Sequence, residues 1–329
     1  MMMKKTRKIN RPYLSIPITL DEALNSLTDA GDIPPSSHLA ELSDLPPEAL
    51  KSFTEVWQEI ETEKRRKIIP RLAELAEENV EFNYDGIFKL GLEDVDPQVR
   101  LASVNGLWEN CQSWLQRKLI LMAKGDPCEE VRVASVQALE RFCLDAELNN
   151  RQESKQLLSS ILISIFKNPD ESDHLRRRSL EAVSPLDMAE ARHAIEQAFQ
   201  SNNRELEVGS VYAMGASCNP SWLPSLLPQL QTGDAELRYE AARACGKIGE
   251  EDAISYLVPL LEDEDKDVQM AAIQALGKIG GKEAREILLG LLESADELLR
   301  DSARQAIYEL ELYNDPFSAN SLKISEDDL

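Results

Sequence analysis

An apolar residue that returns at a fixed spacing is the feature that most constrains this chain. Successive anchors are separated by 32, 44, 31, 31, 31 and 31 residues, so one unit is repeated through most of the sequence. A period of this size is typical of a solenoid, in which each unit buries its apolar face against its neighbours. We therefore expect an extended array with a long surface for binding. The seven anchors are Val99, Val131, Leu175, Leu206, Leu237, Val268 and Leu299.

Each unit carries the pattern of two helices, most clearly in residues 253–280. The first helix has an apolar stripe at i, i+3, i+4 and i+7, which is one helical face; it comprises Ile254, Leu257, Val258 and Leu261. The second helix begins three residues before the anchor, at a position that favours side chains able to accept the free N–H groups of a first turn. That position holds Asp96, Cys128, Ser172, Asn203, Asp234, Asp265 and Asp296.

Small side chains mark the second helix. Positions counted from the anchor are written +1, +2 and so on, and positions +4 and +7 hold only Gly, Ala or Ser in all seven units. At 100° per residue they share one face with the anchor, so we expect the second helices to approach closely there. The residues are Ser103, Ser135, Ser179, Ser210, Ala241, Ala272 and Ala303 at +4, and Gly106, Ala138, Ala182, Ala213, Ala244, Ala275 and Ala306 at +7.

These positions together resemble the HEAT repeat, in the short bacterial form found in phycobilisome lyase subunits. The pattern stands most clearly at Asp265, Val268, Ala272, Ala275 and Gly277, and the resemblance covers about residues 82–312. It implies an all-α fold, an α-α superhelix of the armadillo/HEAT-like class with about seven helix pairs. It also implies protein binding as the commonest role, and it permits a lyase-like subunit or chaperone for a phycobilin (tetrapyrrole) chromophore as the alternative.

The flanking segments lack the repeat pattern. We expect an extended or disordered Pro-rich arm with a basic start over residues 1–48, with a short helix over Leu20 to Leu27 as an alternative within it, and a helical N-terminal cap over residues 49–80. The solenoid is expected over residues 81–312, with an insertion near 144–155 that explains the spacing of 44. Residues 313–329 are expected to form an acidic tail.

Charge narrows the choice of partner. The net charge is −23, and the basic residues of the first eleven leave 31 basic against 59 acidic residues in the rest. Such a chain repels phosphate backbones and anionic lipids, so we expect no nucleic acid or membrane partner. A protein or peptide is expected instead, with basic segments favoured, among them the chain's own arm lying in an acidic groove. The five cysteines form no C-x-x-C motif and are typical of cytosolic thiols, and the sequence has no apolar membrane span or signal peptide. We therefore expect a cytoplasmic protein.

No motif for catalysis is present in the sequence. The histidines His38, His174 and His193 form no metal-ligand pair, and no Gly-rich phosphate loop or nucleophile motif occurs. We therefore predict no catalytic residue, cofactor or metal. The arginine that follows most anchors is expected to pair with acids of adjacent units as a structural ladder. The denser run of residues 176–178 is interpreted as a solvated cluster, with a site for an acidic peptide or the C-terminal tail as the alternative.

The variable positions of the second helix are the candidate binding residues. Positions +2, +6 and +9 point away from the core stripe, and five of the seven +2 residues are apolar or aromatic. The alternative is that these side chains pack sideways against the next unit. The predicted function is a non-catalytic scaffold or adaptor that binds its partner in a concave groove. The candidate residues are Leu101, Trp108, Val133, Arg177, Val208, Tyr212, Tyr239, Met270 and Tyr308.

Overall fold

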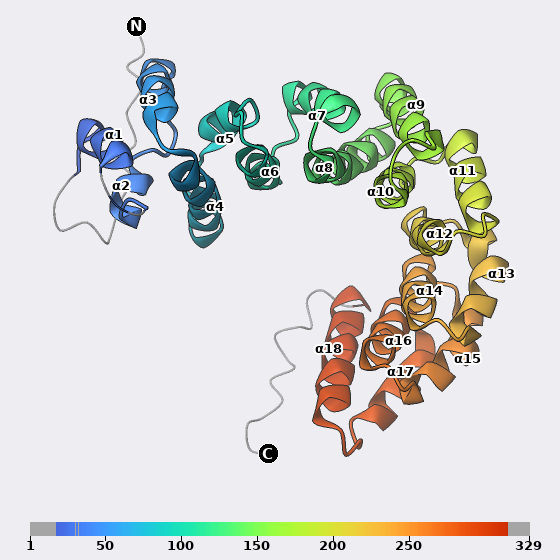
Figure 1. Cartoon of the computed structure of the whole chain (residues 1–329). Helices are drawn as coiled ribbons and strands as arrows, with labels where there is room; N and C mark the ends of the chain where they lie inside the picture. The colour runs from blue at the N-terminus through green and yellow to red at the C-terminus, as the bar shows by residue number, and fades with distance from the viewer. Residues whose placement is uncertain (1–17, 30, 32, 315–329) are drawn as a thin grey trace, which may run out of the picture. The chain divides into compact units, whose positions relative to one another are not determined.

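The computed structural model describes residues 18–29, 31 and 33–314, and within them every regular element is a helix (Figure 1). The chain divides into two compact units, residues 1–138 and 139–329. The first unit contains α1 (Leu20–Thr28), α2 (Ser36–Ala40), α3 (Pro47–Glu59), α4 (Thr62–Glu78), α5 (Asp85–Gly91), α6 (Pro97–Gly106), α7 (Ser113–Gly125) and the start of α8 (Glu129–Leu148).

The second unit begins within α8 and continues with five further helix pairs. Its elements are α9 (Gln152–Lys167), α10 (Asp173–Val183), α11 (Ala189–Phe199), α12 (Arg204–Ala216), η1 (Pro220–Trp222), α13 (Leu223–Leu226), η2 (Leu227–Gln231), α14 (Ala235–Ile248), η3 (Glu251–Ala253), α15 (Ile254–Leu257), η4 (Val258–Glu262), α16 (Lys266–Ile279), α17 (Gly281–Leu291) and α18 (Glu297–Asn314). From α5 onward the elements form the seven expected helix pairs, which confirms the fold class.

Within the described part of residues 1–48, the expectation of an extended arm is wrong at α2, whereas α1 lies where the sequence allowed a short helix. Helices α1 and α2 lie there, and they bury Leu24, Leu27 and Leu39. The prolines that suggested an extended chain stand at helix starts, with Pro35 before α2 and Pro47 as the first residue of α3. Proline is favoured at these positions because the first helical N–H groups have no partner within the helix. The basic start and the acidic tail fall on residues 1–17 and 315–329, outside the described residues.

The predicted N-caps of the second helices are confirmed in six units. Side chains of Asp96, Ser172, Asn203, Asp234 and Asp265 accept hydrogen bonds from backbone N–H groups of the first turn. Asp296 does the same for the N–H of Leu298. These caps fix where each second helix begins, and therefore keep the units in register.

The first helices vary more than the second ones. In units five and six the first helix is divided into short α and 3₁₀ segments at Pro228 and Pro259, since proline removes an internal hydrogen bond. Unit seven has Gly290 at that position, and α17 is continuous. The insertion lengthens α8 and α9 and leaves a turn of only residues 149–151, where Asn150 has φ of 49°.

The recurrent arginine is structural, as expected, and uses two kinds of partner. Arg100 and Arg238 pair with Asp126 and Asp263 of the following unit, at 2.7 Å each. Most members also donate to the backbone carbonyl six residues earlier, which closes the loop before the second helix; the acceptors are the carbonyls of Asp94, Asp126, Thr232 and Ser294 for Arg100, Arg132, Arg238 and Arg300. The arginine therefore joins the start of its own second helix to the loop before it and, in Arg100 and Arg238, to the following repeat.

Second helices of the later units meet through glycine. A Cβ placed on Gly215, Gly246 or Gly277 would lie 2.5 Å, 2.7 Å or 2.9 Å from an atom of the alanine at +7 in the next second helix. The three alanines are Ala244, Ala275 and Ala306. The glycines occupy position +9, so in these three units that position faces the neighbouring second helix rather than solvent.

Candidate interaction surface

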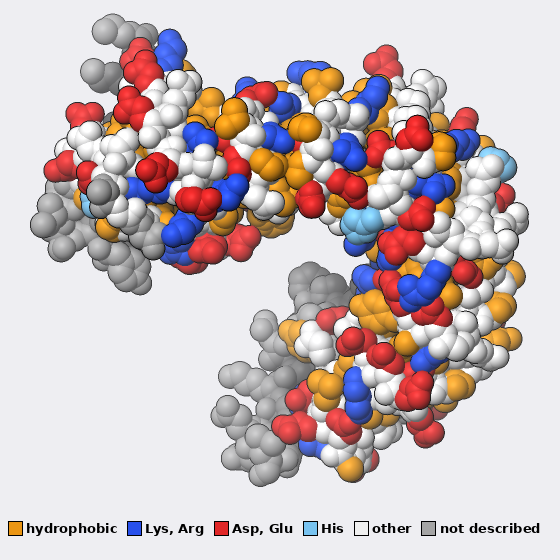
Figure 2. Space-filling model, in the orientation of Figure 1, with side chains coloured by type: hydrophobic (Ala, Val, Ile, Leu, Met, Phe, Trp, Pro, Cys, Tyr) orange, Lys and Arg blue, Asp and Glu red, His pale blue; other side chains and the backbone are white. Residues whose placement is uncertain are grey.

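The second helices α10, α12 and α14 lie on the inner side of the bend of the second unit, with α11, α13 and α15 on the outer side (Figure 1). On this inner side, acidic and basic side chains lie close together between apolar ones (Figure 2). The residues that give this surface its character come from positions −1 to +10 of these helices and from the last part of α8.

Arg177 of α10 is the centre of an ion-pair network that joins three helices. Its Nε donates to Glu181 at 2.8 Å, and its Nη1 donates to Glu205 of α12 at 3.2 Å and to Glu236 of α14 at 3.1 Å. Gly209 of α12 makes room for it, because a Cβ there would lie 2.7 Å from Arg177 Cγ. Although burial opposes the charged form, the hydrogen bond and charge of Glu181 raise the pKa of the guanidinium.

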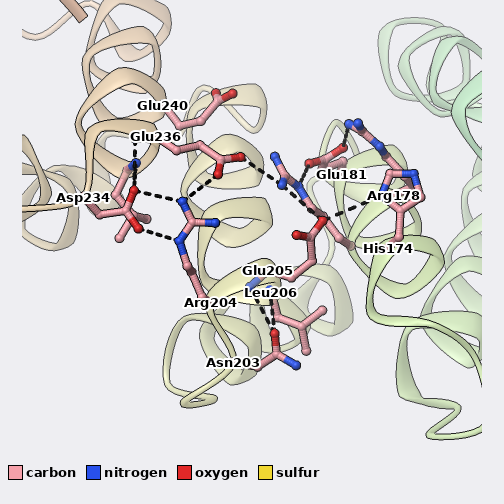
Figure 3. Close-up of polar contacts among 12 residues, drawn as sticks. His174, Arg178, Glu181, Asn203, Arg204, Glu205, Leu206, Asp234, Glu236 and Glu240 are labelled. Carbon is pink, nitrogen blue, oxygen red and sulfur yellow. Dashed lines mark hydrogen bonds and ion pairs between the residues drawn. The ribbon is translucent and has the colours of Figure 1, made fainter. Parts of the chain in front are cut away.

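The network continues through Arg178 and Arg204 (Figure 3). Arg178 pairs with Glu181 at 2.7 Å. Arg204 pairs with Asp234 and Glu236, at 2.5 Å and 2.8 Å, and its side chain is more than half exposed. The charges of α10, α12 and α14 are thus largely neutralised by one another, and their side chains are held in fixed positions.

Two tyrosines sit among these charges. The hydroxyl of Tyr212 donates to Glu140 at 3.0 Å, and the Lys247 ammonium lies 4.5 Å from the Tyr212 ring centroid. The Arg243 guanidinium lies 5.3 Å from the ring centroid of Tyr239. Both tyrosines are partly exposed. A cation over the face of a tyrosine ring is attracted by the ring quadrupole, so each pair is pre-arranged.

Burial shifts the titration of several groups on this surface. Desolvation raises the pKa of Glu140 and of Glu240 above the usual carboxyl range. Desolvation, together with the like charge of Arg243, lowers the pKa of Lys247. These shifts have a common cause, since all three groups lie where neighbouring second helices exclude water.

Three of the candidate +2 residues are buried rather than exposed. Val208 is fully buried, Val133 is buried, and Arg177 is buried in its ion pairs. Met270 at +2 contacts Ser302 at +3 of the next helix, with Sδ and Oγ 2.8 Å apart. The interpretation of position +2 as surface is therefore wrong at Val133, Val208 and Arg177. At Arg177 the physical reason is the sideways contact that was the alternative, because its guanidinium pairs with Glu205 and Glu236 of the next two second helices.

The remaining candidates are accessible. Leu101, Tyr212, Tyr239 and Met270 are partly exposed, and the +9 residues Trp108 and Tyr308 are 54% and 43% exposed. Whether they bind a partner stays a prediction. The run of residues 176–178 is not a solvated cluster at Arg177, whose donors are directed to glutamates of its own chain.

Sequence reasoning missed Glu140, Glu240, Arg243 and Lys247. Acidic residues are too frequent here to stand out, yet Arg243 and Lys247 follow Tyr239 at i+4 and i+8 on one helix face. That spacing was the available signal. The described residues contain no group of three or more His, Cys, Asp or Glu side chains that could hold a metal ion. They also contain no helix that is long and apolar enough to cross a membrane.

The stacked helix pairs define a solenoid of the armadillo/HEAT class, a fold typical of protein-interaction scaffolds. Residues 223–307 match the family of HEAT repeats, which agrees with the repeat pattern of these units. No curated protein sequence is significantly similar to this chain.

Solved structures share the fold at low sequence identity. A structure of Kap95p with RanGDP has 14% identity and a TM-score of 0.52, over 89% of this chain and 45% of that chain. Importin beta has 13% identity and a TM-score of 0.49, over 91% and 47%. The CpcE and CpcF complex of phycocyanin lyase from Nostoc sp. PCC7120 has 18% identity and a TM-score of 0.45, over 66% and 84%.

Proposed function

We propose that this chain is a non-catalytic scaffold that binds a protein or peptide partner along the second helices of residues 139–329. The observation that carries the proposal is the arrangement of Tyr239, Arg243 and Lys247 on one face of α14, with Tyr212 of α12 under Lys247. Tyrosine and arginine are the residue types that most often dominate binding energy at protein interfaces. Their positions are fixed before any partner arrives, which lowers the entropy lost on binding.

Long-range charge supports a partner with basic segments. The net charge of −23 attracts cationic chains and repels anionic ones at distances where the contacts of α14 play no part. Local contacts then decide the register of binding. We expect the association rate to fall steeply as ionic strength rises, while the dissociation rate depends on the tyrosines.

The test is affinity capture from the native host followed by mass spectrometry, with the variant Tyr239→Asp beside the unaltered chain. We expect the variant to lose the captured partner and to keep the melting temperature. The matched control is Tyr256→Asp, a 39% exposed tyrosine on α15 of the outer side, which should retain the partner. A loss of stability in Tyr239→Asp would show that this side chain packs as core and would refute its binding role.

The alternative role implied by the family resemblance is a phycobilin-lyase-like subunit or a chromophore chaperone. It is tested separately, by adding bilin to the purified chain and recording the visible spectrum. A shifted absorbance band would favour that role over the scaffold.

A further inference from the structure

The last second helix, α18, differs from the others at the positions that contact a following unit. Position +5 is buried and apolar in six units and holds Arg304 in the seventh; the six residues are Val104, Val136, Leu180, Val211, Ala242 and Ile273. Position +9 is glycine in the three preceding units and Tyr308 here. Position +2 holds Asp301, which pairs with Arg304 at 2.6 Å.

These replacements prevent a second helix from stacking on α18 in the usual way. The preceding stacks need a glycine at +9, because even one added Cβ would come within 3 Å of the next helix. The Tyr308 side chain is far larger, so a head-to-tail continuation at that separation is blocked. A head-to-tail contact of this kind would also form open filaments unless it closed into a ring.

The same flank is nevertheless not a polar cap. An open groove of about 680 Å³ runs between α17 and α18, and its floor is apolar, formed by Leu289, Leu292, Ile307 and Tyr308. Leu289 and Tyr308 are 38% and 43% exposed. Terminal units of a solenoid require a polar outer face to remain soluble on their own, and an apolar groove of this size marks a contact surface.

The charged rim of the groove indicates what covers it. Asp301, Arg304, Tyr308 and Glu311 line the groove from α18 at spacings of three, four and three residues, which is one helix face. Consider two antiparallel α18 helices related by a twofold axis that passes between Ile307 and Tyr308. Arg304 and Glu311 then lie on opposite sides of this axis, each about 5 Å from it along the helix. Arg304 of each copy then faces Glu311 of the other.

We propose that this groove is the interface of a twofold homodimer, with α18 of a second copy as its occupant. The Tyr308 rings and the apolar floor form the centre, and two symmetric pairs of Arg304 with Glu311 flank it. An isologous interface has to be complementary to itself, and opposite charges at equal distances from the axis satisfy that condition. The proposal is independent of the partner-binding role of α12 and α14.

The test is sedimentation velocity on the full chain from about 1 to 300 μM, a range that brackets weak and moderate dimers. We expect a reversible shift from 36.9 kDa to twice that mass. Tyr308→Asp should weaken the dimer roughly 100-fold or more, because each dimer loses two central aromatic side chains. Tyr256→Asp is the control and should leave the association unchanged, and thermal melts establish that both variants are folded.

A charge swap tests the register. Arg304→Glu and Glu311→Arg should each weaken the dimer roughly tenfold, and the double variant should bind more tightly than either single variant, since the pair between copies is restored with reversed sign. Recovery is partial, because the pairs of Arg304 with Asp301 and of Glu311 with Arg285 within each copy are not restored. A chain that stays monomeric at all concentrations overturns the proposal, as does a dimer that tolerates Tyr308→Asp. Dimerisation only after removal of residues 315–329 would assign the groove to that segment instead and would also overturn it.

Discussion

Within residues 139–329, neighbouring second helices are joined in two different ways. Between α12, α14, α16 and α18, glycine at +9 meets alanine at +7, and the contact is a close approach of two backbones. Between α10 and α12, the +9 residue is Ser184, and Arg177 extends across Gly209 to glutamates of two further helices. One period therefore does not imply one kind of interface: the first contact depends on shape, and the second depends on charge.

The largest expected effect is at the charged junction. Arg177→Ala should lower the free energy of unfolding by about 3 kcal/mol, because it leaves Glu181 buried with one cation fewer and Glu205 and Glu236 without Arg177 as a partner. Urea denaturation measures the change. Arg204→Ala is the matched control from the same network, and it should cost only a fraction of this, since the Arg204 side chain is more than half exposed.

Equal losses in the two arginine variants would show that the junction does not depend on a buried cation.

A smaller effect is expected at the glycine junctions. Gly215→Ala forces a methyl group to within 2.5 Å of Ala244 Cα, and the helices have to separate, at a cost of about 2 kcal/mol. The same urea experiment applies. Gly233→Ala is the control, because it adds the same methyl group where nothing lies within 4 Å. If both variants unfold alike, close approach of the helices is not what joins these units.

The smallest expected effect is a change in how the stability of the fold depends on pH. Burial raises the pKa of Glu240, so its charge is unfavourable in the folded state and this cost is relieved as the pH falls through the raised pKa. Glu240→Gln should therefore stabilise the chain at pH 7 to 8, by an amount that shrinks toward pH 5. Thermal melts across this range measure it.

The control for the pH series has the opposite sign. The hydrogen bond from Arg238 lowers the pKa of Asp263, so the ionised carboxylate stabilises the fold above its unfolded pKa and this stability is lost as the pH falls through the lowered value. Asp263→Asn should destabilise the chain at pH 7, and the difference should disappear in acid. The same sign for both variants would contradict the assignment.

Local rules predicted the second helices well. The cap position and the small +4 and +7 residues are properties of one helix, and they were readable from the repeat because a cap needs only a short polar side chain. The prolines before α2 and α3 were misread for the converse reason, since proline both interrupts helices and begins them. Which of the two occurs depends on packing that involves Leu24, Leu27 and Leu39, residues with no repeat to identify them.

The candidate surface was predictable only in part. A helical wheel tells which residues point away from one core, but Val208 and Met270 have a second neighbour at the side, and the direction of stacking decides which flank it covers. Gly215, Gly246 and Gly277 were the available indication, because three glycines one period apart mark a close contact. The Arg177 network was readable only in part. Glu205 and Glu236 stand one period apart at position −1, but Glu181 lies on the same helix as Arg177 and nothing in the repeat pattern joins it to them.

The contacts at the three glycine junctions are made by the same two residue types, so one repeat can take the place of another there. A copy of residues 235–265 inserted after residue 265 would present Gly246 to a second Ala244, the same two residue types that already meet at each later step, so the array could be lengthened or shortened by whole units without new contacts. The Arg177 junction occurs once, and no unit taken from elsewhere in the chain could replace it. Variation in length among related chains is therefore expected between α12 and α18, while the segment from α10 to α12 stays constant in number.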